Sequence, residues 1–171
     1  MKKTSLIFSI LLIAIVTLLT IGNKTIYTDI IIHSPVDHVW EKFMNFPDYP
    51  RWNPFILKVN GEIKTGNTIE VVIKPKDREP MTFKPTIQAI EERALLQWDG
   101  KLFVPGIFTG KHTFEFITID KNNTKFIHKE EFNGILVPFI DLTPTRLGFE
   151  SMNIALKYVV EKNNSKQLSS P

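Results

Sequence analysis

Three polar residues that could take part in acid–base or hydrogen-bonding chemistry, His112, His128 and Glu130, lie in two stretches of alternating apolar and polar side chains. Because successive side chains of a strand point to opposite faces, all three share a face with a group of phenylalanines, namely Phe114, Phe116, Phe126 and Phe132. A three-residue hairpin loop at 121–123 would place His112 opposite Phe132, whereas a loop one step earlier would place it opposite Glu130. The second register predicts an imidazole–carboxylate bond.

Two interpretations of this cluster remain open. The residues could satisfy one another as a buried structural pair. Alternatively, they could orient a ligand carbonyl or hydroxyl, or move protons as an acid–base pair, which makes His112, His128 and Glu130 weak catalytic candidates. The sequence has no nucleophile motif, no glycine-rich phosphate loop and no H-E-x-x-H spacing, so we expect no metal and no cofactor. It also has no cysteine, which excludes thiolate chemistry and cysteine-ligated zinc.

The elements before the cluster read as a strand, a helix and a compact turn. Residues 25–33 are rich in isoleucine and predict a strand. Ser34 followed by Pro35 is a helix-start signal, with Ser34 as N-cap and Pro35 in the first turn, and apolar residues then recur at helical spacing from 36 to 43. Three prolines between 47 and 54 punctuate a turn that holds Trp52 and Phe55.

From residue 56 to 132, turn signals at regular spacing predict an antiparallel meander. Thr143-Pro144 then begins a long helix with an apolar stripe, which we expect to end at 163–165. The stripe consists of Phe149, Met152, Leu156 and Val159. Asn153 stands one step from the stripe and could bond a ligand or a strand carbonyl, of which we favour the carbonyl.

The first residues form an apolar segment. No charge occurs between Lys3 and Lys24, a run of 20 residues that would span about 30 Å as a helix. We expect residues 1–23 to be a retained single-pass anchor that crosses a membrane at 4–22, followed by one domain at 24–163 and a flexible tail at 164–171. A cleaved signal peptide and a buried core helix are the alternatives. Lys2 and Lys3 favour a domain on the extracytoplasmic side.

Charge excludes one class of partner. The net charge is +3, and without Lys2 and Lys3 the count is 21 − 2 = 19 basic against 18 acidic residues. Basic and acidic side chains also alternate along the chain rather than cluster. We therefore expect no nucleic-acid binding.

Several segments resemble motifs of one superfamily. Residues 34–40, SPVDHVW, and especially 46–55, FPDYPRWNPF, look like two motifs of the START-like (SRPBCC, polyketide cyclase-like) superfamily, and 110–114, 128–134 and 149–157 look like later ones. The resemblance implies an α+β helix-grip fold, in which a curved antiparallel sheet wraps around a long C-terminal helix and leaves a cavity between them. The apolar N-terminal segment departs from many members.

The resemblance also implies a site. The residues expected to face an apolar ligand are Trp52, Phe55, Trp98, His112, Phe114, Phe132, Phe149, Met152, Asn153 and Leu156, although each aromatic ring could equally serve as core. The first hypothesis is a membrane-anchored protein that binds a lipid, quinone or polyketide-like molecule. The alternatives are a cyclase or dehydratase using the histidine–glutamate groups, and an accessory factor for a membrane protein.

Overall fold

Two antiparallel sheets form the body of the protein. The computed structural model describes residues 2–102 and 106–168. The larger sheet has the order β1-β8-β7-β6-β5 and the smaller one the order β2-β3-β4. Their bounds are β1 Asn23–Ile32, β2 Ile56–Asn60, β3 Glu70–Ile73, β4 Met81–Phe83, β5 Thr86–Glu91, β6 Leu95–Leu102, β7 Phe108–Asp120 and β8 Asn123–Asn133. An isolated bridge between Thr68 and Thr86 links the two sheets.

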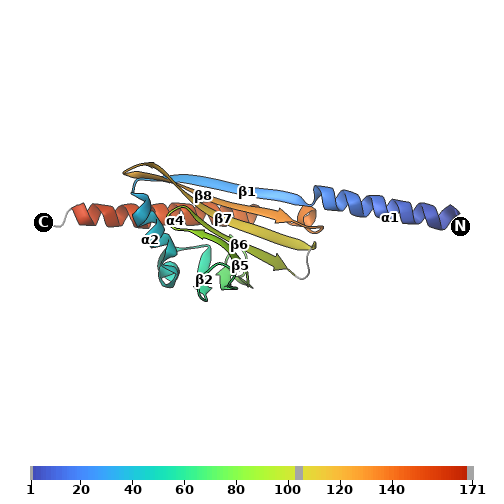
Figure 1. The fold of residues 1–171 in the computed structure, drawn as a ribbon, viewed down its shortest axis with the longest axis horizontal. Helices are drawn as coiled ribbons and strands as arrows, with labels where there is room; N and C mark the ends of the chain where they lie inside the picture. Colours follow the sequence, from blue (N-terminus) through green and yellow to red (C-terminus); the bar gives the residue numbers. More distant parts are fainter. Residues whose placement is uncertain (1, 103–105, 169–171) are drawn as a thin grey trace.

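The helices flank these strands. Two of them, α1 and the C-terminal end of α4, project from opposite ends of the strands (Figure 1). The helical elements are α1 Lys2–Ile21, α2 Val36–Met44, η1 Phe46–Asp48, α3 Tyr49–Trp52, η2 Val137–Phe139 and α4 Thr143–Leu168. This α+β arrangement, an antiparallel sheet packed on a long C-terminal helix, is the helix-grip architecture that the sequence predicted. The meander, however, divides into two sheets, and β1 joins the larger one beside β8.

Both helix starts differ in detail from the prediction. Pro35, with a ψ of 146°, is the N-cap of α2, and Ser34 makes no cap bond. An extended proline thus starts the helix one residue later than expected. At α4 the Asp141 carboxylate accepts the Thr143 N–H at 2.9 Å, so an aspartate two residues upstream satisfies the first free amide. The helix continues to Leu168, beyond the expected end at 163–165.

The apolar stripe of α4 closes the core. Phe149, Met152 and Leu156 are fully buried, and the next buried position is Val160, while Val159 is only partly buried. The stripe therefore follows the helix by three and four residues, and the predicted Val159 stands beside it. The stripe packs into one cluster with inward-facing rings of β7 and β8, among them Phe114 and Phe126.

The N-terminal segment is helical, as expected, and the large apolar side chains whose burial the structure describes are exposed. Phe8 is 71% exposed and Ile13 is 65% exposed. Among the residues that the structure describes, no helix is both long enough and apolar enough to cross a membrane. The membrane span expected at 4–22 is therefore not shown. The burial that a core helix would require is not shown either.

Candidate functional site

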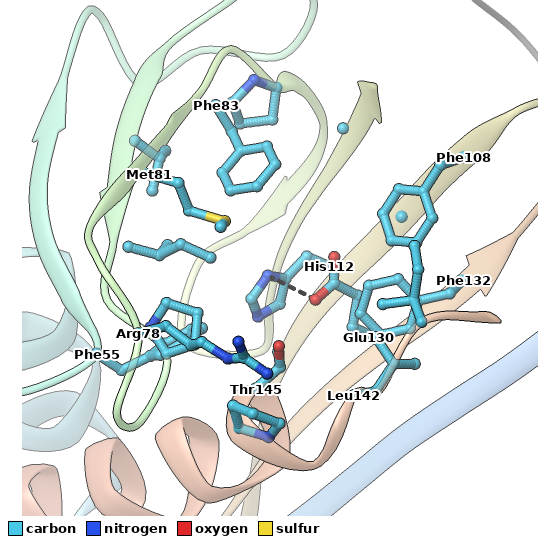
Figure 2. Close-up of a pocket in the computed structure, with 18 of the residues that line it drawn as sticks. Phe55, Arg78, Met81, Phe83, Phe108, His112, Glu130, Phe132, Leu142 and Thr145 are labelled. Atoms are coloured by element: carbon cyan, nitrogen blue, oxygen red, sulfur yellow. Dashed lines mark ion pairs between the residues drawn. The ribbon is translucent and has the colours of Figure 1, made fainter. Parts of the chain in front are cut away.

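A cavity of about 420 Å³ lies between the inner face of the larger sheet, the smaller sheet and the first turn of α4. Most of its wall is apolar, and rings contributed by separate strands line it on different sides (Figure 2). The lining residues are Phe55, Val71, Ile73, Pro75, Arg78, Met81, Phe83, Pro85, Trp98, Gly100, Lys101, Phe108, Gly110, His112, Glu130, Phe132, Ile140, Asp141, Leu142, Pro144 and Thr145.

Only some of the site residues that the sequence proposed line the cavity. Phe55, Trp98, His112 and Phe132 line the cavity, and Glu130 joins them. The others do not line it: six are buried in the core and Trp52 is partly buried against that core. The six buried residues are Phe114, His128, Phe149, Met152, Asn153 and Leu156. Helical spacing identifies the buried stripe of α4, but it does not reveal that Phe55 covers part of this helix.

The hairpin register explains how His112 meets Glu130. Two residues, Lys121 and Asn122, separate the paired positions Asp120 and Asn123, and the pairing brings His112 directly opposite Glu130. This is one of the two registers that the sequence left open. His112 Nδ1 lies 3.7 Å from Glu130 Oε2, which is close but longer than a hydrogen bond (Figure 2).

A glycine makes room for the carboxyl group. A Cβ built on Gly110, which pairs with Phe132, would overlap Glu130 Oε1. Gly110 in turn pairs with Gly100 of β6, and both line the cavity. The two facing glycines contribute no side chains of their own, which leaves room for the Glu130 carboxyl group beside Gly110. The sequence contains both residues, but the alternation pattern gave no signal that they lie opposite each other.

His112 bonds a second histidine rather than the glutamate. The two Nε2 atoms of His112 and His128 are 2.6 Å apart. His128 continues through its Nδ1 to Asn153 Oδ1 at 3.1 Å, and Asn153 Nδ2 reaches Thr28 Oγ1 at 2.9 Å. The predicted bond from Asn153 to a strand carbonyl is thus wrong, because a histidine and a threonine hydroxyl take both ends of the amide.

Burial controls the protonation of this cluster. It lowers the pKa of His112 to about 3 and raises the pKa of Glu130 to about 8. Burial, and then the nearby His112, hold the pKa of His128 well below its usual range, against the opposing bond from Asn153. At neutral pH both imidazoles are neutral and Glu130 mostly carries its proton. The cluster thus presents hydrogen-bonding groups to the cavity without a net charge.

Three further polar side chains of the cavity wall come from two segments that the sequence did not connect. The connection between β3 and β4 carries Arg78, Asp141 lies just before α4, and Thr145 lies in the first turn of that helix. The Lys76 N–H donates to the Pro144 carbonyl at 3.2 Å, which joins these segments. The bond from Thr143 lowers the pKa of Asp141, with a smaller contribution from Arg78. Figure 2 shows Arg78 and Thr145 on the same side of the cavity.

The family comparison covers nearly the whole domain. The family model described as "Polyketide cyclase / dehydrase and lipid transport" matches residues 24–160. The chain belongs to this family. It is therefore a START-like (SRPBCC) domain protein, as its motifs predicted. No curated protein has a significant sequence match to it.

Solved structures of low sequence identity share the fold. Norcoclaurine synthase from Thalictrum flavum is 15% identical, with a TM-score of 0.61 over 83% of this chain and 96% of that one. A protein from Chromobacterium violaceum is 14% identical, with a TM-score of 0.63 over 80% and 96%. A third, from Nitrosomonas europaea, is 12% identical, with a TM-score of 0.63 over 82% and 96%. At these identities the likeness establishes architecture.

Proposed function

We propose that this family member binds an apolar or amphiphilic small molecule in its internal cavity. The observation that carries the proposal is the 420 Å³ space walled mostly by aliphatic and aromatic side chains, with a few polar groups that include the buried pair His112 and Glu130. Ligand sites typically combine such a wall with a few fixed polar groups. The family description includes lipid transport, and a solved norcoclaurine synthase holds dopamine and hydroxybenzaldehyde.

Native mass spectrometry of the full-length chain, purified from its own host, tests the binding. We expect a co-purifying molecule in the wild-type protein and its loss in Gly100→Leu. The Gly100 Cβ would meet only the Gly110 carbonyl oxygen at 4.0 Å, so a leucine there extends into the cavity. Lys111→Leu places the same side chain at a neighbouring exposed position of β7 and should retain the molecule. Equal retention in both variants would contradict an internal site.

A proton-transferring enzyme is the second candidate. The observation that favours it is a buried glutamic acid with a pKa of about 8 beside a histidine in the same cavity. Such an acid could protonate a bound ketone. Against it, a His112 pKa of about 3 makes this imidazole a weak base at neutral pH. If Glu130→Gln retains ligand and turns over candidate ketones at the wild-type rate, the enzyme proposal fails.

We further propose that α1 attaches the domain to a membrane. The supporting features are the uncharged run between Lys3 and Lys24 and the exposed apolar side chains of α1. An apolar ligand would also be concentrated in lipid. We expect the full-length chain to sediment with membranes after a high-salt wash, and Leu11→Asp together with Leu12→Asp to release it. Recovery of wild type in the soluble fraction would overturn the attachment.

The side of the membrane can be tested because the chain has no cysteine. Lys2 and Lys3 precede the apolar run, and the positive-inside rule then places the domain outside the cytoplasm. Gln88→Cys introduces one thiol at an exposed position of β5. A membrane-impermeant maleimide added to intact cells should label this variant. Labelling only after lysis would place the domain on the cytoplasmic side.

A further inference from the structure

We infer that the cavity recognises the polar end of its ligand as one neutral hydroxyl, which donates to His112 Nδ1 and accepts from the Glu130 carboxyl. The inference rests on the proposed binding function and names the class of molecule bound. It follows from a chain of hydrogen bonds that starts at a backbone carbonyl, so the position of each proton determines the next.

The first link fixes the orientation of Asn153. Thr28 Oγ1 lies 3.1 Å from the His128 carbonyl oxygen, and because a carbonyl only accepts, the threonine proton points there. The Asn153 amide reaches the same Oγ1 at 2.9 Å and must therefore donate to it through Nδ2. Its Oδ1 then faces His128 Nδ1 at 3.1 Å.

The second link fixes both imidazoles. Asn153 Oδ1 can only accept, so His128 Nδ1 carries the proton. Burial keeps this ring neutral, so its Nε2 is bare. His112 Nε2, 2.6 Å away, must donate to it. His112 is also neutral, and its Nδ1 is left as a bare acceptor at the cavity wall.

The third link concerns the groups that face the cavity. His112 Nδ1 and Glu130 Oε2 are 3.7 Å apart, which is too long for a direct hydrogen bond. Burial raises the pKa of Glu130 to about 8, so its carboxyl can donate at neutral pH. A bound group that contacts both residues must give a proton to Nδ1, and it satisfies the Glu130 O–H only if it also accepts a proton. A hydroxyl does both with a single atom.

The same geometry disfavours other head groups. An ether or ester oxygen accepts but cannot donate to Nδ1, and a carboxylate cannot donate to it either. An ammonium would donate to both groups, and its charge would be buried at a cost unless Glu130 gave up its proton to pair with it. Since most of the remaining wall is apolar, the ligand class is a largely apolar alcohol or phenol.

Nitrogen-15 NMR of histidine-labelled full-length protein tests the proton positions without a ligand. We expect His128 to be protonated at Nδ1 and His112 at Nε2, with a bare nitrogen at the other position of each ring. His112→Phe and His128→Phe assign the signals among the four histidines. A proton found on His112 Nδ1 would overturn the inference, because the ring would then have no acceptor for the hydroxyl.

Calorimetry with three probes on one frame tests the ligand class. At pH 7 we expect 4-hydroxybiphenyl to bind the full-length chain at least about tenfold more tightly than 4-methoxybiphenyl. One hydrogen bond of about 1.4 kcal/mol lowers the dissociation constant about tenfold. Biphenyl-4-carboxylate should bind more weakly than the phenol. Equal affinity for all three would overturn the hydroxyl inference and leave the cavity function intact. No binding of any probe would overturn both.

Two variants at Glu130 separate recognition from packing. Glu130→Gln keeps an N–H donor and should retain the preference for the phenol over the ether. Glu130→Leu has no donor and should reduce that ratio several-fold, while the affinity for the ether stays near wild type. An unchanged ratio in Glu130→Leu would show that Glu130 does not contact the hydroxyl and would overturn its part in the site.

Discussion

At the scale of single residues, Glu130 connects the cavity to the stability of the fold. Its pKa rises from 4.5 to about 8 on burial, so the folded state holds this proton more tightly than the unfolded chain does. The associated stability is complete below about pH 4.5 and is lost as the pH rises through 8. Ionisation of Glu130 in alkaline solution therefore lowers the free energy of unfolding.

We therefore expect Glu130→Gln to become increasingly stable relative to wild type between pH 4.5 and 8. The amide cannot ionise, and a pKa difference of one between the folded and unfolded states corresponds to about 1.4 kcal/mol, so the gain above about pH 8 should reach a few kcal/mol. Urea unfolding at about pH 4.5, 6.5 and 8.5 measures it. Glu131→Gln, in which the altered side chain is partly exposed beside Lys129, is the matched control. A pH-independent difference would contradict the buried acid.

Asn153 offers a second prediction at this scale. It is 3% exposed and orients His128, whereas its neighbour Ile154 is 63% exposed. Asn153→Leu leaves the His128 Nδ1–H and the Thr28 hydroxyl short of a partner, so we expect a loss of about 1–3 kcal/mol in the free energy of unfolding. Ile154→Leu should change it by less than about 0.5 kcal/mol. Chemical denaturation of the two variants side by side decides the point.

The sequence predicts which face of the sheet carries the polar residues better than it predicts their hydrogen-bond partners. Alternation with a period of two places His112, His128 and Glu130 together, and the structure confirms that arrangement. The bond between the two histidines was missed because it depends on side-chain rotamers across paired strands, which spacing does not determine. Asn153 was misassigned for the same reason, since its true partner lies on a strand 25 positions away.

At the scale of elements, the contact between α4 and Phe55, which follows the proline-rich turn, depends on Gly148. A Cβ at this position would overlap the Phe55 ring, which also packs edge-on against Phe149 with centroids 5.2 Å apart. The helix can approach this close because residue 148 has no side chain. The sequence predicted both elements, but the glycine inside the helix gave no indication of its packing role.

Gly148→Ala therefore has an expected sign that opposes helix propensity. Alanine within a helix usually stabilises by about 0.5–1 kcal/mol relative to glycine. Here we expect a loss of about 1–3 kcal/mol because of overpacking against Phe55. Adding Phe55→Leu should recover part of that loss, and a double-mutant cycle from thermal unfolding measures the coupling. Additive effects in the cycle would show that the two residues do not meet.

At the scale of the whole molecule, the cavity exists because two sheets and a helix do not fill the space between them. The sequence predicted the helix-grip architecture from motifs near its start and from the final helix. It did not assign the cavity wall contributed by β3, β4 and the segment at 140–145. These residues come from short, irregular segments whose contacts arise only when the chain closes on itself.

Substitutions at two glycines, one beside open space and one in close contact with a neighbouring ring, test whether the cavity is empty. Gly100 has open space where its Cβ would lie, and an empty apolar cavity forgoes packing contacts. We expect Gly100→Leu to raise the free energy of unfolding of ligand-free protein by about 0.5–2 kcal/mol, while Gly148→Ala lowers it. Lys111→Leu, which adds leucine at an exposed position, should leave it nearly unchanged. Destabilisation by Gly100→Leu comparable to that of Gly148→Ala would mean that the protein's own side chains already occupy this region.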